Sequence, residues 1–92
     1  MKMRPSRVLK LLRDGKTARC LKLNLADPAV VEIAAASGAD CVWIDCEHGP
    51  NTIRDVERQV LAAHAAGIDT LVRTSKGSYS DLVRPLELDA TG

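Results

Sequence analysis

Apolar and polar positions along the chain follow two alternating spacings. In four stretches the apolar residues recur every three or four positions, which is typical of helices with one buried face. In three shorter stretches they alternate with polar residues or run together, which is typical of strands. Turn and cap residues such as Asp14-Gly15, Asp27-Pro28 and Gly49-Pro50 separate the stretches. The pattern predicts helices over 6–12, 27–38, 52–67 and 80–90, and strands over 19–25, 41–46 and 68–74.

The helical spacing also selects the residues that should face the core. Thr52 and Asp55 form a capping-box pattern at the start of the third helix. Pro85 lies inside the fourth helical stretch, where it should kink the helix or begin a second short one. The expected inner residues are Val8, Leu11 and Leu12 in the first helix, Val30, Ile33 and Ala34 in the second, and Ile53, Val56, Val60 and Ala63 in the third.

Strands that alternate with helices at this distance form right-handed βαβ units, which have parallel strands. The nearly continuous apolar run over 41–46 favours a strand that is covered on both faces. We therefore predict an α/β fold in which an N-terminal helix precedes about three βα units. The basic helix should occupy residues 1–16 and the βα units residues 17–92.

Composition narrows the class of protein. The chain has 92 residues, of which 46% are apolar and 27% charged, and its only aromatic residues are Trp43 and Tyr79. This is the composition of one small globular domain with an aliphatic core. No apolar run approaches the roughly 18 residues of a membrane span, and residues 1–13 lack the apolar stretch of a secretion signal. We expect no membrane partner.

Charge and cysteine content bear on partners and location. Residues 1–22 carry eight Lys or Arg and one acid, whereas residues 23–92 carry five Lys or Arg and eleven acids. The basic segment is open to two interpretations: the solvated face of a helix, or a surface for nucleic acid or anionic membrane. The near absence of aromatic residues argues against nucleic acid. Three cysteines, Cys20, Cys41 and Cys46, without a secretion signal predict reduced thiols in the cytoplasm.

Reactive side chains gather at the predicted carboxyl ends of the strands, where βαβ proteins bind ligands. Lys22 lies near the end of the first strand, Asp45, Glu47 and His48 follow the second, and Arg73 ends the third. His48 beside two carboxylates suits a general base, with Asp45 or Glu47 as its orienting partner. The alternative is a histidine that only caps a loop.

Arg73 ends an apolar strand, so its permanent charge needs a partner. Its planar fork suits a substrate carboxylate or an enolate oxygen, and the alternative is a structural salt bridge to Asp45 or Glu47. Lys22 is expected either to attract an anionic substrate or to be solvated.

The sequence gives weaker support to the remaining candidate residues. The three cysteines lack the spacing of a zinc site and are expected to be buried and inert. His64 is expected to be a packed or surface histidine, and the loop at Ser75-Lys76-Gly77-Ser78 lacks the complete phosphate-loop pattern.

The sequence resembles the HpcH/HpaI aldolase family, the class II pyruvate aldolases. The resemblance lies in residues 27–33, in Ile44-Asp45-Cys46-Glu47-His48-Gly49-Pro50-Asn51, and in Val72-Arg73 some twenty residues later. It implies a (β/α)8 barrel, often assembled into hexamers, that cleaves or forms 4-hydroxy-2-oxo acids and yields pyruvate and an aldehyde. It also implies a divalent metal, Mg²⁺, Mn²⁺ or Co²⁺, that binds the pyruvate.

By motif, the resemblance makes His48 the base, Asp45 its partner and Arg73 the ligand of the pyruvate oxygen. Glu47 and Lys22 are expected near the substrate, and Lys22 stands where some members carry a tryptophan, which favours an acidic acceptor. No residue matches the metal-binding Glu and Asp of later strands, so no metal ligand is expected in this chain.

A barrel takes about 250 residues, so we expect this chain to be the N-terminal portion of one. It should oligomerise or combine with a C-terminal piece. Two other functions remain open. One is a catalytically inactive remnant or assembly partner, and the other is a lyase of citramalyl or malyl thioesters.

Overall fold

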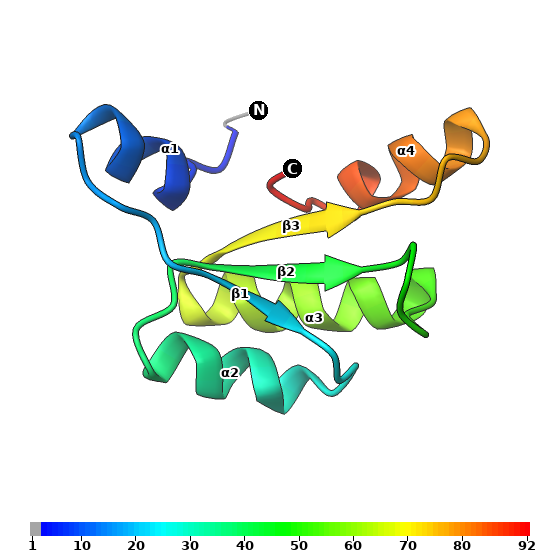
Figure 1. Cartoon of the computed structure of the whole chain (residues 1–92), viewed down its shortest axis with the longest axis horizontal. Helices are drawn as coiled ribbons and strands as arrows, with labels where there is room; N and C mark the ends of the chain where they lie inside the picture. The colour runs from blue at the N-terminus through cyan, green and yellow to red at the C-terminus, as the bar shows by residue number, and fades with distance from the viewer. Residues whose placement is uncertain (1–2) are drawn as a thin grey trace.

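The computed structural model describes residues 3–92 and contains one parallel sheet with four helices around it (Figure 1). The strands lie in the order β1-β2-β3. The elements are α1 (Arg7–Arg13), β1 (Cys20–Leu23), α2 (Pro28–Ala36), β2 (Cys41–Asp45), α3 (Ile53–Ala66), β3 (Asp69–Arg73) and α4 (Tyr79–Glu87). The predicted α/β order and the parallel strands are confirmed.

Helices α2 and α3 cover one face of the sheet (Figure 1). Side chains alternate between the two faces of a strand, so Leu23, Val42 and Ile44 point toward these helices and are buried. The buried residues that pack against them from the helices include Val31, Ala34, Val56, Val60 and Ala63. Both clusters of buried apolar residues therefore lie on the side of the sheet that α2 and α3 cover, whereas Cys41, which alternates with Val42, is buried on the other side.

Local sequence explains where these helices begin and end. The carboxylate of Asp27 accepts a hydrogen bond from Ala29 N at 2.9 Å, and Pro28 occupies the first turn of α2. Thr52 and Asp55 make the predicted capping box of α3, and their hydrogen bonds hold the pKa of Asp55 below its ordinary value. Gly67 ends α3 with a φ of 75°, a left-handed conformation that glycine adopts without strain.

Helix α1 lies at the amino ends of the strands (Figure 1). Its first turn binds the carboxylate of Asp69 at the start of β3, through the hydroxyl of Ser6 and the N–H groups of Arg7 and Val8. Arg7 also donates to Asp40 at 2.8 Å. The amide of Arg19 and the guanidinium of Arg7 hold the pKa of Asp40 below its ordinary value.

The residues after α4 return to the free edge of β3. Gly92 N donates to Thr70 O, and Val72 N donates to Gly92 O. This is the pattern of a parallel strand pair, so the chain enters a fourth strand position beside β3.

Several details of the prediction were wrong. Helix α1 begins at Arg7 and buries none of its residues, and Leu12 is exposed; residues 1 and 2 of the predicted 1–16 helix lie outside the described residues. Strand β1 ends before Leu25, which is exposed. Ile33 is 63% exposed, and Val31 takes the inner position instead.

Pro85 does not begin a second short helix, which was one of the two outcomes predicted for it. The helix continues from Tyr79 to Glu87, and Pro85 is its buried residue. A proline inside a helix removes one main-chain hydrogen bond, and burial of the ring compensates for part of that loss. Among residues 3–92, no helix has both the length and the apolar character needed to cross a membrane.

Candidate active site at the carboxyl ends of the strands

Two neighbouring strands end in side chains of opposite charge. Asp45, the last residue of β2, is in register with Arg73, the last residue of β3. Both lie on the sheet face that α2 and α3 leave open, because they alternate with the buried Ile44 and the partly buried Val72. Lys22 on β1 shares this face through its pairing with Trp43. The sequence predicted this grouping.

The carboxylate of Asp45 is 2% exposed and is surrounded by donors. Arg73 donates to both of its oxygens, from Nε at 3.0 Å and from Nη2. The N–H groups of Glu47 and His48 each donate to Oδ1 at 3.0 Å, and Lys22 Nζ is 3.3 Å from Oδ2. These partners, Arg73 first, hold the pKa of Asp45 far below its ordinary value, and Asp45 in turn raises the pKa of Arg73.

Glu47 is the carboxylate that lies against the ring of His48. His48 Nε2 is 3.0 Å from Glu47 Oε1, and Arg73 Nε is 3.8 Å from the same oxygen. Asp45 binds the main-chain N–H of His48, not its ring. The pairing of the His48 ring with Asp45, which the resemblance implied, is therefore not the one in this structure. His48 and Arg73 nevertheless both contact the same oxygen, Glu47 Oε1.

The loop after β2 is held by residues that the sequence analysis did not select. Asn51 Nδ2 donates to the carbonyl of Asp45 at 2.9 Å, and Gln59 Nε2 donates to Asn51 Oδ1 at 3.0 Å. Gln59 is fully buried in α3. A Cβ on Gly49 would lie 2.7 Å from the carbonyl oxygen of Asp45, so the loop needs glycine there for space. A polar residue at an inner helix position was the available signal for Gln59.

Trp43 was also missed. Its ring lies beneath two cations: the guanidinium carbon of Arg73 is 5.0 Å from the ring centre and Lys22 Nζ is 5.9 Å from it. Both distances are in the range of cation–π attraction. The available signal was period-two alternation, which puts Trp43 on the same face as Asp45.

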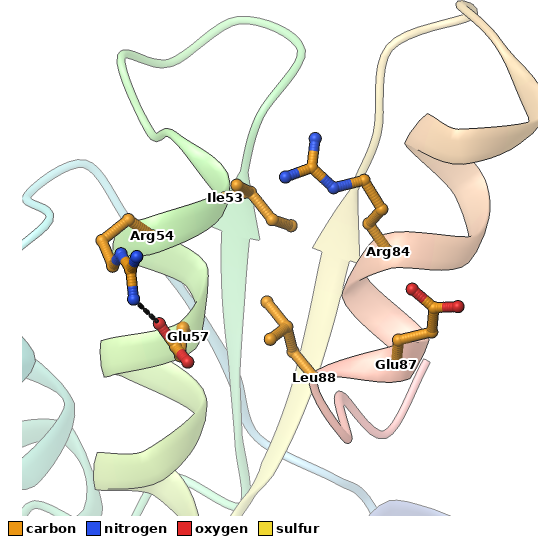
Figure 2. Close-up of a pocket in the computed structure, with 6 residues that line it drawn as sticks. All are labelled: Ile53, Arg54, Glu57, Arg84, Glu87 and Leu88. Atoms are coloured by element: carbon orange, nitrogen blue, oxygen red, sulfur yellow. Dashed lines mark hydrogen bonds and ion pairs between the residues drawn. The ribbon is translucent and has the colours of Figure 1, made fainter.

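Two pockets lie among the described residues, and Asp45, Glu47, His48 and Arg73 line neither of them. One pocket, of about 250 Å³, lies between α3 and α4, and a second, of about 220 Å³, lies between the loops that follow β2 and β3. Figure 2 shows the first, lined by Ile53, Arg54, Glu57, Arg84, Glu87 and Leu88.

The described residues do not fit a metal ion. No group of three or more His, Cys, Asp or Glu side chains among residues 3–92 is arranged to hold one. Asp45, the buried acid of the site, already has cations and N–H groups as neighbours. Such an environment disfavours a further cation.

The remaining candidates fall outside the site. Cys41 is buried and Cys46 partly buried, and burial raises the pKa of both thiols; Cys20, expected to be buried, is exposed. His64 is packed against the carbonyl of Asp89, with Nε2 at 3.0 Å. In the loop after β3, the carboxylate of Asp81 accepts a hydrogen bond from Ser78 N, and its negative charge disfavours a phosphate at that N–H group.

Comparison with known proteins identifies the family. The sequence profile described as HpcH/HpaI aldolase/citrate lyase matches residues 20–88. The chain is 35% identical over 79 residues to the 2-keto-3-deoxy-L-rhamnonate aldolase of Salmonella gallinarum, covering 86% of this chain and 30% of the relative. It is 37% identical over 79 residues to the aldolase of the same name from Shigella sonnei, with the same coverage.

Comparison with solved structures gives the same family. An HpcH/HpaI aldolase from Desulfitobacterium hafniense superposes with a TM-score of 0.83 at 34% identity, covering 90% of this chain and 32% of that one. The citrate synthase SbnG superposes with a TM-score of 0.83 at 31% identity, covering 88% and 33%. The chain spans about 30% of the length of the curated relatives, and its open sheet matches part of their barrel. With this profile match over most of its length and this superposition, the chain belongs to the HpcH/HpaI aldolase/citrate lyase family.

Proposed function

We propose that this chain supplies the part of a pyruvate aldolase active site that binds the 2-oxo acid and moves its proton. The complete reaction is cleavage or formation of a 4-hydroxy-2-oxo acid, with pyruvate and an aldehyde as the other side of the equilibrium. The observation that carries the proposal is the meeting of His48 and Arg73 at Glu47 Oε1, at the carboxyl ends of the strands. A three-carbon acid can contact both side chains there.

Arg73 has the role of the anion-binding group. Removal of a methyl proton from pyruvate gives an enolate, and negative charge develops on its oxygen. A guanidinium held in place before the reaction stabilises that charge without having to reorganise. Asp45 holds Arg73 in place through two hydrogen bonds, so Asp45 is an anchor for the cation.

His48 has the role of the base. Its side chain is 69% exposed, so the ring reaches substrate and solvent alike, and Glu47 orients it from 3.0 Å. A carboxylate beside an imidazole stabilises the imidazolium that forms when the ring takes a proton. His48 thus removes the methyl proton in one direction and returns it in the other.

Aldolases of this family are metal-dependent, with Mg²⁺, Mn²⁺ or Co²⁺ as the expected ions. Because the described residues do not fit a metal, we assign its ligands to parts of the barrel beyond these strands and derive no step through it. The names of the curated relatives favour 2-keto acids as the substrate class.

Exchange of the methyl protons of pyruvate for deuterium, followed by proton NMR, tests this function. With the rest of the barrel present to bind Mn²⁺, we expect exchange above the buffer rate, and loss of that exchange in His48→Ala. His64→Gln is the matched control, because His64 contacts Asp89 on another side of the molecule. Equal exchange rates for wild type and His48→Ala would refute the role of His48.

A second function is favoured by one observation, the absence of a metal-holding cluster among residues 3–92. On this view the chain is an inactive assembly partner. Calorimetry with Mn²⁺ and pyruvate distinguishes the two functions, because an assembly partner binds neither ligand, whereas the aldolase portion binds pyruvate through Arg73.

A further inference from the structure

Trp43 lies in the middle of the open sheet face, between the cations of the candidate site. Its neighbours in register are Lys22 on β1 and Leu71 on β3, and Arg73 is two residues further along β3. Arg73 and Lys22 lie 5.0 Å and 5.9 Å from the ring centre. An aromatic face attracts cations at this distance, so the ring restricts where both side chains can lie.

The same cations converge on one oxygen. Arg73 Nη2 and Lys22 Nζ both contact Asp45 Oδ2. Asp45 is 2% exposed, whereas the side chains of Lys22 and Arg73 are 39% and 33% exposed. Two cations therefore face solvent above a single buried carboxylate. The other acid at Arg73, Glu47, lies against the ring of His48 beyond the end of the strand.

We propose that Trp43 is a positioning residue that holds Arg73 and Lys22 side by side, so that Arg73 reaches the oxygen on which the enolate charge develops and Lys22 reaches the carboxylate of the oxo acid. This rests on the proposed function, since the oxo acid is its substrate. Long cationic side chains lose rotamer freedom when they bind a ligand, and a ring that orders them beforehand removes part of that cost. Among residues 3–92, Nη1 of Arg73 has no hydrogen-bond partner and can donate to the keto oxygen of the oxo acid.

The first test is spectroscopic. A guanidinium over an indole face has its Hε resonance shifted upfield by the ring current. We expect that shift for Arg73 in the wild-type chain, its loss in Trp43→Leu and its partial retention in Trp43→Phe. Leu21→Ala, which removes an exposed apolar residue from the opposite face of β1, should leave the shift unchanged. An unshifted Arg73 resonance in the wild type overturns the proposal.

The second test measures affinity for pyruvate by calorimetry. Loss of both cation–π contacts should weaken binding about tenfold in Trp43→Leu. Trp43→Phe should restore affinity to within about threefold of the wild type, since a smaller aromatic face remains. Pyruvamide, which has no charge, should bind all these variants equally weakly. Lys22→Met keeps the ring, should also weaken pyruvate binding, and serves if Trp43→Leu does not fold.

The outcomes separate this inference from the proposed function. Equal pyruvate affinity in wild type, Trp43→Leu and Lys22→Met overturns the inference, whatever the proton exchange shows. Pyruvate binding that depends on Trp43, without exchange of the methyl protons, supports the inference and refutes the proposed function. A wild-type chain that does not bind pyruvate refutes both.

Discussion

Asp45 shows how one residue can organise a site without reacting. Its oxygens accept from Arg73, from two main-chain N–H groups and from Lys22. A buried carboxylate with this many donors stays ionised and has no oxygen left to orient the ring of His48. Asp45 therefore fixes the orientation of the Arg73 side chain and the start of the loop that carries His48.

Asp45→Asn should lower the free energy of unfolding at pH 7, because it leaves Arg73 and Lys22 without their anion. The pKa of Asp45 is lowered in the folded state, so its contribution is complete above the unfolded value near 3.8 and is lost as the pH falls below that value. Urea unfolding between pH 7 and pH 2 should show the difference between wild type and variant narrowing in acid.

Asp14→Asn is the control for this measurement, since Asp14 forms an exposed ion pair with Lys10 on the surface. A constant difference between Asp45→Asn and wild type over the whole pH range would contradict the assignment.

Gly49 is needed because a side chain at this position would collide with the main chain. The Cβ of Gly49→Ala would lie 2.7 Å from the carbonyl oxygen of Asp45, which Asn51 also binds. We expect a loss of about 1–3 kcal/mol in unfolding free energy, and changed chemical shifts for His48 because the loop must move. Gly15→Ala is the matched control: nothing lies within 4 Å of its Cβ, so only backbone strain remains. An unchanged His48 would show that the loop does not depend on this contact.

At the scale of elements, α1 differs from α2 and α3 in how it is held. Helices α2 and α3 bury apolar residues against the sheet, whereas α1 buries none. Its attachment is polar and concentrated at its first turn, on Asp69 and Asp40. Removal of such a contact should release the helix without melting the sheet.

Asp69→Ala tests this attachment. Hydrogen bonds to an ionised group contribute about 1.5–3 kcal/mol each, so the loss should speed hydrogen exchange of the α1 amides at least about tenfold. The amides of β2 should change much less. Asp14→Ala, which removes only the Lys10 pair at the other end of α1, is the control. Equal acceleration in α1 and β2 would mean that the helix and the sheet unfold together.

At the scale of the whole molecule, the sheet has one covered and one open face. Among residues 3–92, no strand pairs with the outer edge of β1, and Leu71 on the open face is 41% exposed. Unpaired edges and apolar surface promote association. A separate segment of a barrel has this same asymmetry between its two faces.

A solution of these 92 residues should therefore associate as its concentration rises. Sedimentation velocity should show increasing mass, and Leu71→Lys should reduce it by placing a charge on the open face. Leu86→Lys, at an exposed position on α4, should have little effect. A single monomeric species at every concentration would contradict this prediction.

Much of this architecture could be predicted because it depends on local patterns. The capping box at Thr52, the Asp27-Pro28 start of α2 and the end of α3 at Gly67 are interactions within a few residues. The alternation of helices and strands implied parallel pairing, and parallel pairing brought Asp45 and Arg73 together at the carboxyl ends of adjacent strands. The grouping of the site residues was therefore determined by the sequence pattern.

Other features were decided only by tertiary packing. Ile33 and Val31 each fit a helical stripe that includes Ala34, and the packing of α2 against the sheet buries Val31 and leaves Ile33 exposed. Whether Asp45 or Glu47 faces the ring of His48 depended on the path of the loop, which Gly49, Asn51 and Gln59 fix. The sequence by itself thus determined which residues lie together at the carboxyl ends of the strands, because the period and direction of each strand depend on local residues. Only the folded chain decided which atoms touch, because those contacts join side chains whose separation depends on the packing of distant elements.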